Sequence, residues 1–146
     1  MLPPQPPCRY VSALDIQTRF NDFDAFAHIN NISYLQYFDL GKEHFFNTLM
    51  GGIFSPRELS AVLVNVNIQF YAPTAAHEPL QVLTGLVKLG ENSIHLDQRI
   101  VNPQTGQVKT TCAAILAGFD VDTQTAGPIP APLRAELTRL LEEHTL

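Results

Sequence analysis

Polar side chains are concentrated in the stretch from Asp22 to Asn31, DFDAFAHINN, directly before a long apolar segment. Two carboxylates, one imidazole and two carboxamides lie here. If the apolar segment is a helix, the free N–H groups at its start carry about half a positive charge and can polarise a carbonyl. A carboxylate beside them could attack that carbonyl or deprotonate a water, which is the chemistry of acyl transfer.

The same residues have simpler interpretations. Asp and Asn before a helix are commonly N-caps, which accept hydrogen bonds from free backbone N–H groups. His28 is a turn residue, a metal ligand with Asp22 and Asp24, or a catalytic group. A metal centre needs three or four converging ligands, and this spacing has no second His or Cys cluster beside it. We therefore expect no metal and no cofactor.

Other catalytic patterns are missing from the chain. Ser33, Cys8 and Cys112 lie in no nucleophile elbow and in no Cys-His signature. Glycine-rich phosphate-binding motifs do not occur. The chemistry therefore points back to the stretch from Asp22 to Asn31.

The elements around this stretch predict an α+β fold. Apolar residues at helical spacing predict a long helix over 31–49, and the proline-opened segment 130–141 predicts a short one. Alternating or apolar runs predict strands at 10–20, 61–73, 79–89, 93–101 and 107–121. Turn residues separate the last three strands, as in an antiparallel meander. One long apolar helix against one antiparallel sheet is the expected architecture.

Length and charge limit the possible functions. A chain of 146 residues fits one domain, which we place at 10–146 after a proline-rich arm at 1–9. The net charge of −5, without any Lys/Arg cluster, argues against a nucleic acid partner. We expect no signal peptide, no membrane span and two reduced cysteines, and hence a cytoplasmic protein. Hydrophobic residues make up 45% and charged residues 16%, which leaves apolar surface for a subunit interface.

The stretch RFNDFDAFAHINNISYLQYFDLGKEHFF resembles the thioesterases related to 4-hydroxybenzoyl-CoA thioesterase, whose motif runs approximately D-x-D-x-x-G-H-V-N-N-x-x-Y. The matching residues are Asp22, Asp24, His28, Asn30, Asn31 and Tyr34. A looser similarity extends from about Leu14 to Pro130. The resemblance implies a hotdog fold, in which a curved antiparallel sheet wraps one long central helix. It also implies a homodimer or homotetramer with each site at a subunit boundary.

Residue by residue, the resemblance implies hydrolysis of an acyl-CoA, or of an acyl carrier protein thioester. Asp24 would be the catalytic carboxylate, as nucleophile or general base, and the backbone N–H of Asn31 would polarise the thioester carbonyl. His28 and Asn30 would position the loop and the attacking water. Tyr34 would line the acyl pocket or pack in the core.

One residue departs from the family pattern. The glycine before the histidine is Ala27 here. If that position needs a positive φ, Ala strains it by about 1 kcal/mol. A non-catalytic acyl-CoA-binding subunit is therefore an alternative function. An enoyl-CoA hydratase of the same fold is disfavoured, because its Gly-Asp-x-Asn-Pro sequence is absent.

Overall fold

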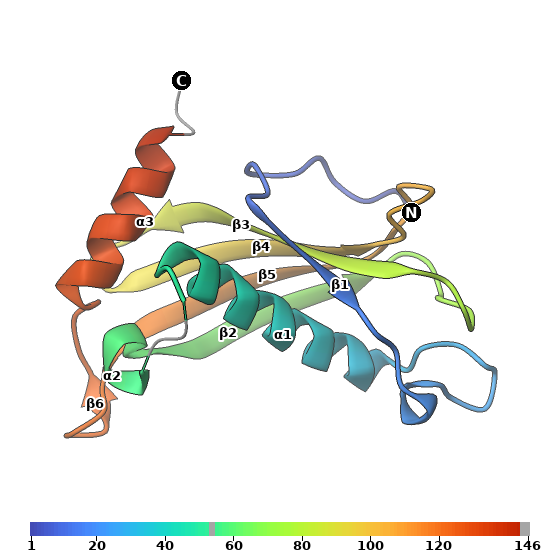
Figure 1. Ribbon diagram of the computed structural model, residues 1–146, viewed down its shortest axis with the longest axis horizontal. Helices are drawn as coiled ribbons and strands as arrows, with labels where there is room; N and C mark the ends of the chain where they lie inside the picture. The colour runs from blue at the N-terminus through green and yellow to red at the C-terminus, as the bar shows by residue number, and fades with distance from the viewer. Residues whose placement is uncertain (53–54, 144–146) are drawn as a thin grey trace.

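A computed structural model of the chain describes residues 1–52 and 55–143 (Figure 1). The helices are η1 (a 3-10 turn, Phe20–Asp22), α1 (Asn31–Leu49), α2 (Pro56–Leu59) and α3 (Ala131–Glu143). The strands are β1 (Ser12–Ile16), β2 (Ala61–Phe70), β3 (Leu80–Leu89), β4 (Ser93–Val101), β5 (Val108–Asp120) and β6 (Thr125–Ala126). The expected long helix has the bounds 31–49, as predicted. Strand β1 is shorter than the expected 10–20, and η1, α2 and β6 were not anticipated.

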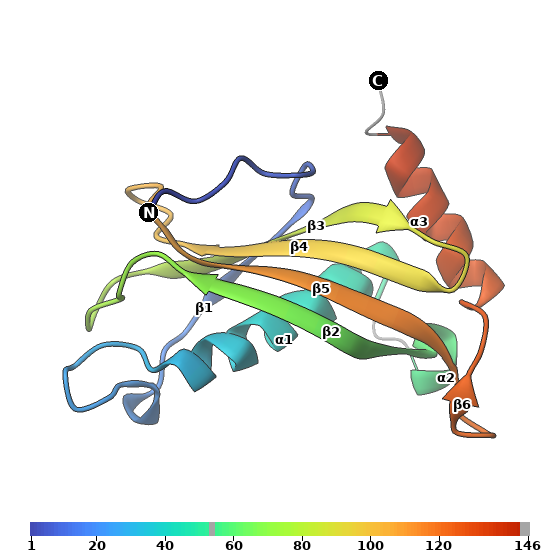
Figure 2. The same ribbon diagram turned by 180° about the vertical axis from the view of Figure 1, so that it is seen from behind.

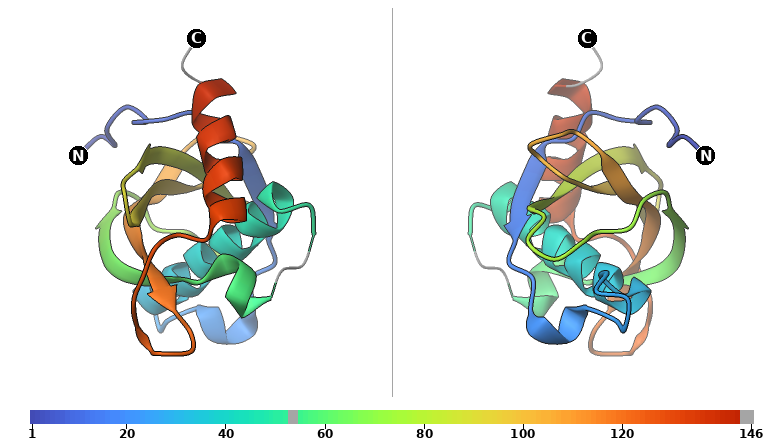
Figure 3. Two further views of the ribbon diagram at one scale, coloured as in Figure 1. Left: turned by 90° about the vertical axis from the view of Figure 1, so that its left-hand side faces the viewer. Right: turned by 90° about the vertical axis from the view of Figure 1, so that its right-hand side faces the viewer.

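The strands form one antiparallel sheet in the order β1-β3-β4-β5-β2, with β6 paired to β5. Strands β3, β4 and β5 are consecutive neighbours, which confirms the meander. The sheet curls around α1, as the end-on views in Figure 3 show, and its strands pass in front of part of the helix when the molecule is seen from behind in Figure 2. The α+β class and the hotdog arrangement are therefore confirmed.

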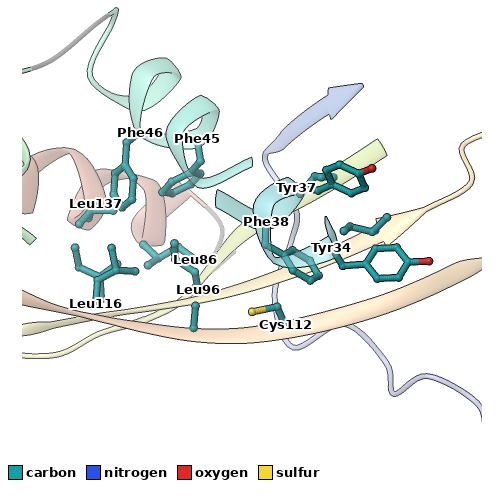
Figure 4. Packing of buried hydrophobic residues seen from close by; sticks show 14 of the residues in the cluster. Tyr34, Tyr37, Phe38, Phe45, Phe46, Leu86, Leu96, Cys112, Leu116 and Leu137 are labelled. Atoms are coloured by element: carbon teal, nitrogen blue, oxygen red, sulfur yellow. The ribbon is translucent and has the colours of Figure 1, made fainter. Parts of the chain in front are cut away.

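The core lies between α1 and the concave face of the sheet (Figure 4). One side of α1 contributes aromatic side chains, because apolar residues recur at helical spacing. The largest buried side chains of α1 are Tyr34, Tyr37, Phe38, Phe45 and Phe46. The sheet contributes Val82, Ile94, Leu96, Ile100, Cys112, Ala114 and Leu116. Helix α3 closes one end of this core with Leu133, Leu137 and Leu140.

Gly41 lets the helix lie close to the sheet. A Cβ at this position would overlap Val82 and lie 2.9 Å from Nε2 of Gln98. The same Nε2 donates to the Phe38 carbonyl at 3.0 Å and to Oγ1 of Thr84 at 3.1 Å. This buried amide therefore fixes where the middle of α1 rests on the sheet.

Strands β1 and β2 are the two edges of the sheet, and α1 packs over β1, β3 and β4 rather than over β2. A bulge between Leu63 and Asn65 shifts the register of β2, so its face toward the core carries Ala61, Leu63, Val66, Ile68 and Phe70. On this face Ala61 and Ile68 pack against the core, and Ile68 is the larger of the two. Their neighbours on that face, Leu63, Val66 and Phe70, are 40–44% exposed. A single chain therefore leaves an apolar edge strand uncovered.

The proline-rich arm forms no regular secondary structure, and it lies over the outer face of β3 and β4. The Tyr10 hydroxyl donates to Oδ1 of Asp97 at 2.5 Å. Gly85 gives the arm room, because a Cβ there would overlap the Arg9 carbonyl and Cys8. Burial raises the pKa of the Cys8 thiol to about 11, so the thiol is protonated near neutral pH. Cys8 and Cys112 are both free thiols.

Candidate active site

The loop before α1 is folded around the Asp24 carboxylate. Oδ1 of Asp24 accepts hydrogen bonds from the backbone N–H groups of Phe26 at 2.9 Å and His28 at 3.2 Å. The Asp24 N–H donates to the His28 carbonyl at 2.8 Å, and the Ala27 N–H donates to the Asp24 carbonyl at 3.0 Å. Asp commonly folds a turn in this way, because its side chain reaches backbone N–H groups two residues on. Oδ2 accepts no hydrogen bond within the described residues, so one oxygen is fixed and the other is available.

Ala27 adopts a φ of +59°, which is the left-handed conformation. The condition under which Ala27 would be strained is therefore met. An L-residue with a Cβ costs about 1–2 kcal/mol in this conformation, whereas glycine adopts it freely. The loop thus keeps the backbone shape that the family's glycine would give, at the expense of strain.

The start of α1 provides backbone N–H groups beside this loop. Asn30 is the N-cap, and its Oδ1 accepts the Ser33 N–H at 3.0 Å. Asn31 is the first helical residue, so its N–H has no acceptor inside the helix. No acceptor for this N–H lies elsewhere in the part of the chain that the structure describes. The Asn31 amide can therefore donate to a ligand.

An open pocket of about 340 Å³ joins these groups. The loop supplies Asp24, His28 and Ile29, α1 supplies Asn31 and Tyr34, and the end of β2 supplies Phe70, Tyr71, Ala72 and Pro73. A volume of this order is typical of small-molecule sites. The pocket combines a carboxylate, a free amide and an apolar wall, which is a set of groups that can bind and attack an acyl carbonyl.

Tyr34 is mostly core. Its side chain is 2% exposed, and its hydroxyl lies 2.8 Å from Oγ1 of Thr74. Its ring is 6.0 Å from the ring of Phe70 in the pocket wall. Burial raises the pKa of Tyr34, so the hydroxyl is neutral and serves as a hydrogen-bonding group. Tyr34 therefore packs in the core directly behind the pocket lining.

Asp22 is buried behind the pocket. Its carboxylate accepts from the Arg19 guanidinium at 2.9 Å, the Tyr37 hydroxyl at 2.5 Å and the Ser33 hydroxyl at 3.3 Å. Burial alone would raise the pKa of Asp22, but the hydrogen bonds from Tyr37 and Arg19 outweigh it and lower the pKa. Asp22 is therefore a structural hydrogen-bond acceptor, and it ties η1 to α1.

The structure brings Asp24, His28, the Asn31 backbone and Tyr34 to one pocket. Asn30 lies beside it, where its side-chain oxygen is occupied by the helix cap. Sequence reasoning missed Phe70 to Pro73 as the opposite wall. That segment stood out only as a loose family similarity, since no local pattern says which loops meet in space.

Comparison with known proteins decides the family. Residues 18–137 match the model of the thioesterase-like superfamily. The chain belongs to this superfamily. Over 128 residues, 87% of this chain, it is 25% identical to the long-chain acyl-CoA thioesterase FadM of Escherichia coli (strain K12), of which the match covers 97%.

Solved structures of other thioesterases share the fold. The thioesterase of Thermus thermophilus complexed with coenzyme A and Zn is 21% identical, with a TM-score of 0.79 over 94% of this chain and 98% of that one. The 1,4-dihydroxy-2-naphthoyl-CoA thioesterase of Synechocystis is 16% identical, with a TM-score of 0.77 over 88% of this chain and 96% of that one. The hotdog fold of the superfamily is therefore shared closely at low sequence identity.

Neither a cluster of metal-binding side chains nor a helix that could span a membrane occurs among the described residues. Among residues 1–52 and 55–143, no three His, Cys, Asp or Glu side chains gather where they could hold a metal ion. None of the helices in the described part of the chain is both long and apolar enough to cross a bilayer.

Proposed function

We propose that this protein is an acyl-CoA thioesterase that hydrolyses a thioester to the free acid and CoA. One observation supports this most: the Asp24 carboxylate, with one oxygen fixed and one available, shares an open pocket with the unpaired Asn31 N–H. Family membership and the similarity to FadM point to the same substrate class. An acyl carrier protein thioester presents the same reacting group and is the alternative substrate.

In the proposed reaction the Asn31 N–H donates to the thioester carbonyl oxygen and stabilises the negative charge that develops there. In one route Oδ2 of Asp24 attacks the carbonyl carbon, the C–S bond breaks and CoA leaves as a thiolate. Water then cleaves the resulting mixed anhydride. In the other route Asp24 takes a proton from a water whose oxygen attacks the carbonyl directly. His28 shapes the Asp24 loop in both, since its backbone bonds Asp24 twice.

Single-turnover hydrolysis in water enriched in oxygen-18 separates these routes. When Asp24 attacks and water then cleaves the anhydride at the Asp24 carbonyl carbon, a carboxylate oxygen stays with the product and the label enters the enzyme, so a labelled enzyme establishes the covalent route. Attack by water leaves the enzyme unlabelled and puts the label into the product acid in the first turnover.

We also propose that the active unit is a homodimer formed through β2. The uncovered edge of this strand offers unpaired backbone groups and an apolar face, which a second copy would cover. The pocket wall at Phe70 to Pro73 continues directly from β2, so this interface would border the site. A homotetramer would be built from two such dimers. The free cysteines suit a reducing compartment, and we place the protein in the cytoplasm.

The first experiment is a hydrolysis screen. Purified protein is incubated with aliphatic and aromatic acyl-CoAs of increasing length, and release of the free CoA thiol is followed. We expect turnover of at least one class. Binding of acyl-CoA without thiol release across the panel would refute the thioesterase proposal and favour a non-catalytic acyl-CoA-binding subunit, to which the strained Ala27 also points.

A further inference from the structure

Lys109, on β5, has its side chain almost fully buried, with 2% exposed. Its Nζ donates to three acceptors: Oε1 of Glu78 at 2.7 Å, Oε1 of Gln107 at 2.7 Å and the carbonyl of Pro73 at 3.0 Å. A buried ammonium has three N–H groups to satisfy, and here each has an acceptor. Such complete pairing makes a buried charge tolerable and its geometry specific.

Glu78 extends this network into the loop between β2 and β3. Its Oε1 also accepts from Nδ2 of Asn102 at 3.1 Å, and its Oε2 accepts the Ala75 N–H at 2.8 Å. Burial alone would raise the pKa of Glu78, but the hydrogen bonds from Lys109 and Ala75 outweigh it and lower the pKa. Glu78 is therefore ionised near neutral pH and holds the backbone of its own loop.

The same loop contacts the candidate active site on its other side. The Thr74 carbonyl accepts the Ile29 N–H at 3.0 Å, and a β-bridge joins Ala75 to His28. His28 in turn bonds the backbone and the carboxylate of Asp24. A path of hydrogen bonds, joined by short backbone segments, thus runs from the Lys109–Glu78 pair to the proposed catalytic carboxylate.

We propose that Lys109 and Glu78 are positioning residues, whose buried ion pair holds the loop at residues 71–78 so that it forms one wall of the pocket and fixes the Asp24 loop. Pro73, bonded directly by Lys109, lines the pocket, and Thr74, next to it, anchors Ile29. The effect on turnover rests on the thioesterase proposal. The effect on loop geometry does not.

The test compares Lys109→Met with Arg57→Ala. Methionine keeps most of the length of lysine and removes its charge and donors. Arg57→Ala breaks an ion pair of similar length, 2.6 Å to Asp122, on the exposed surface away from the pocket. Hydrogen exchange of the Ile29 amide and steady-state kinetics with the best acyl-CoA of the screen are measured for each variant. Glu78→Gln is the milder second variant, because Gln keeps one acceptor oxygen.

For Lys109→Met we expect Ile29 exchange to be about tenfold faster or more, because the loop opens locally. We expect kcat to fall roughly 10- to 100-fold with a smaller change in KM, since misplaced catalytic groups lose rate more than binding. Glu78→Gln should show the same pattern more weakly, and Arg57→Ala neither effect.

Unchanged Ile29 exchange and kcat in a folded Lys109→Met variant would overturn the positioning role. If Lys109→Met does not fold, Ile29 exchange and kcat of Glu78→Gln test the positioning role instead, and unchanged values there would overturn it. If the wild-type protein hydrolyses no thioester, the thioesterase proposal fails, and the exchange of Ile29 still decides whether the ion pair holds the loop.

Discussion

Asp24 and His28 are joined by two hydrogen bonds in opposite directions. The Asp24 N–H donates to the His28 carbonyl at 2.8 Å, and the His28 N–H donates to Oδ1 of Asp24 at 3.2 Å. The pair closes the loop that carries Ala27 at its left-handed position. Because the loop is held by its own backbone, the carboxylate is oriented before any ligand arrives.

The strain at Ala27 predicts that Ala27→Gly stabilises the protein. Removing the left-handed Ala stabilises the folded state by about 1–2 kcal/mol. The greater freedom of Gly in the unfolded chain offsets this by about 0.4–1 kcal/mol. We expect a net gain of about 0.5–1 kcal/mol in the free energy of unfolding, measured with urea. Ala25 lies in the same loop without a positive φ, so Ala25→Gly should destabilise. Equal losses in both variants would contradict the strain.

The buried Asp22 carboxylate predicts a loss of stability in acid. Its pKa in the folded protein lies below its unfolded value of about 3.9, so its contribution is complete above pH 4 and is lost as pH falls through the lower folded pKa. Asp22→Asn should lower the free energy of unfolding by about 2–3 kcal/mol at pH 7 and by progressively less as the pH falls below 4. Chemical denaturation of both proteins from pH 7 downward checks whether their free energies of unfolding approach each other in acid.

Asp122 provides the control for that experiment. Its pKa is also lowered, by hydrogen bonds from Arg57, but both side chains are at least 65% exposed. Exposed ion pairs contribute little to stability, so Asp122→Asn should leave the pH profile almost unchanged. A constant difference between wild type and Asp22→Asn at every pH would show that the Asp22 charge is not what stabilises the fold.

The contact between Tyr34 and Thr74 predicts a characteristic double-mutant result. Tyr34→Phe leaves the buried Thr74 hydroxyl without its partner and should cost about 1–2 kcal/mol. Removing both hydroxyls in Tyr34→Phe with Thr74→Val should cost no more than the single change, because no buried polar group is left unpaired. Additive losses, measured by denaturant unfolding, would mean that the two hydroxyls stabilise the protein independently.

Much of the fold was predictable because it depends on local patterns. The helix from Asn31 to Leu49 shows its apolar spacing and its Asn cap in the sequence, and turn residues mark each corner of the meander. The packing of the proline-rich arm on the sheet, and the turn α2, follow from contacts with distant segments. No local pattern contains that information.

The candidate site was predictable only on one side. The motif residues reveal the Asp24 loop and the helix start, and Ala27 stood out as a residue that would be strained if its φ were positive. The wall at Phe70 to Pro73 and the Lys109–Glu78 pair were not, because side chains from different strands meet only once the sheet has closed.

The uncovered β2 predicts that Val66→Asp weakens self-association. A carboxylate on this apolar face would have to be buried in the proposed dimer, which is unfavourable without a partner. We expect the variant to sediment as a monomer and to lose turnover, if the site needs both subunits. Val87→Asp on β3 is the matched control, because Val87 and Val66 are almost equally exposed, at 39% and 40%. Equal association of both variants would place the interface elsewhere.

The most direct test of the account is the turnover of Asp24→Asn against Asp120→Asn. Asp120 is a close structural match, because its Oδ1 also accepts two backbone N–H groups, those of Asp122 and Thr123, in a turn that does not line the pocket. Both substitutions keep a side-chain oxygen for their turns and remove the charge. Asp24→Asn should lose at least about 99% of thioester hydrolysis while remaining folded, and Asp120→Asn should retain it. Full turnover by a folded Asp24→Asn variant would contradict the assignment of Asp24 as the catalytic carboxylate.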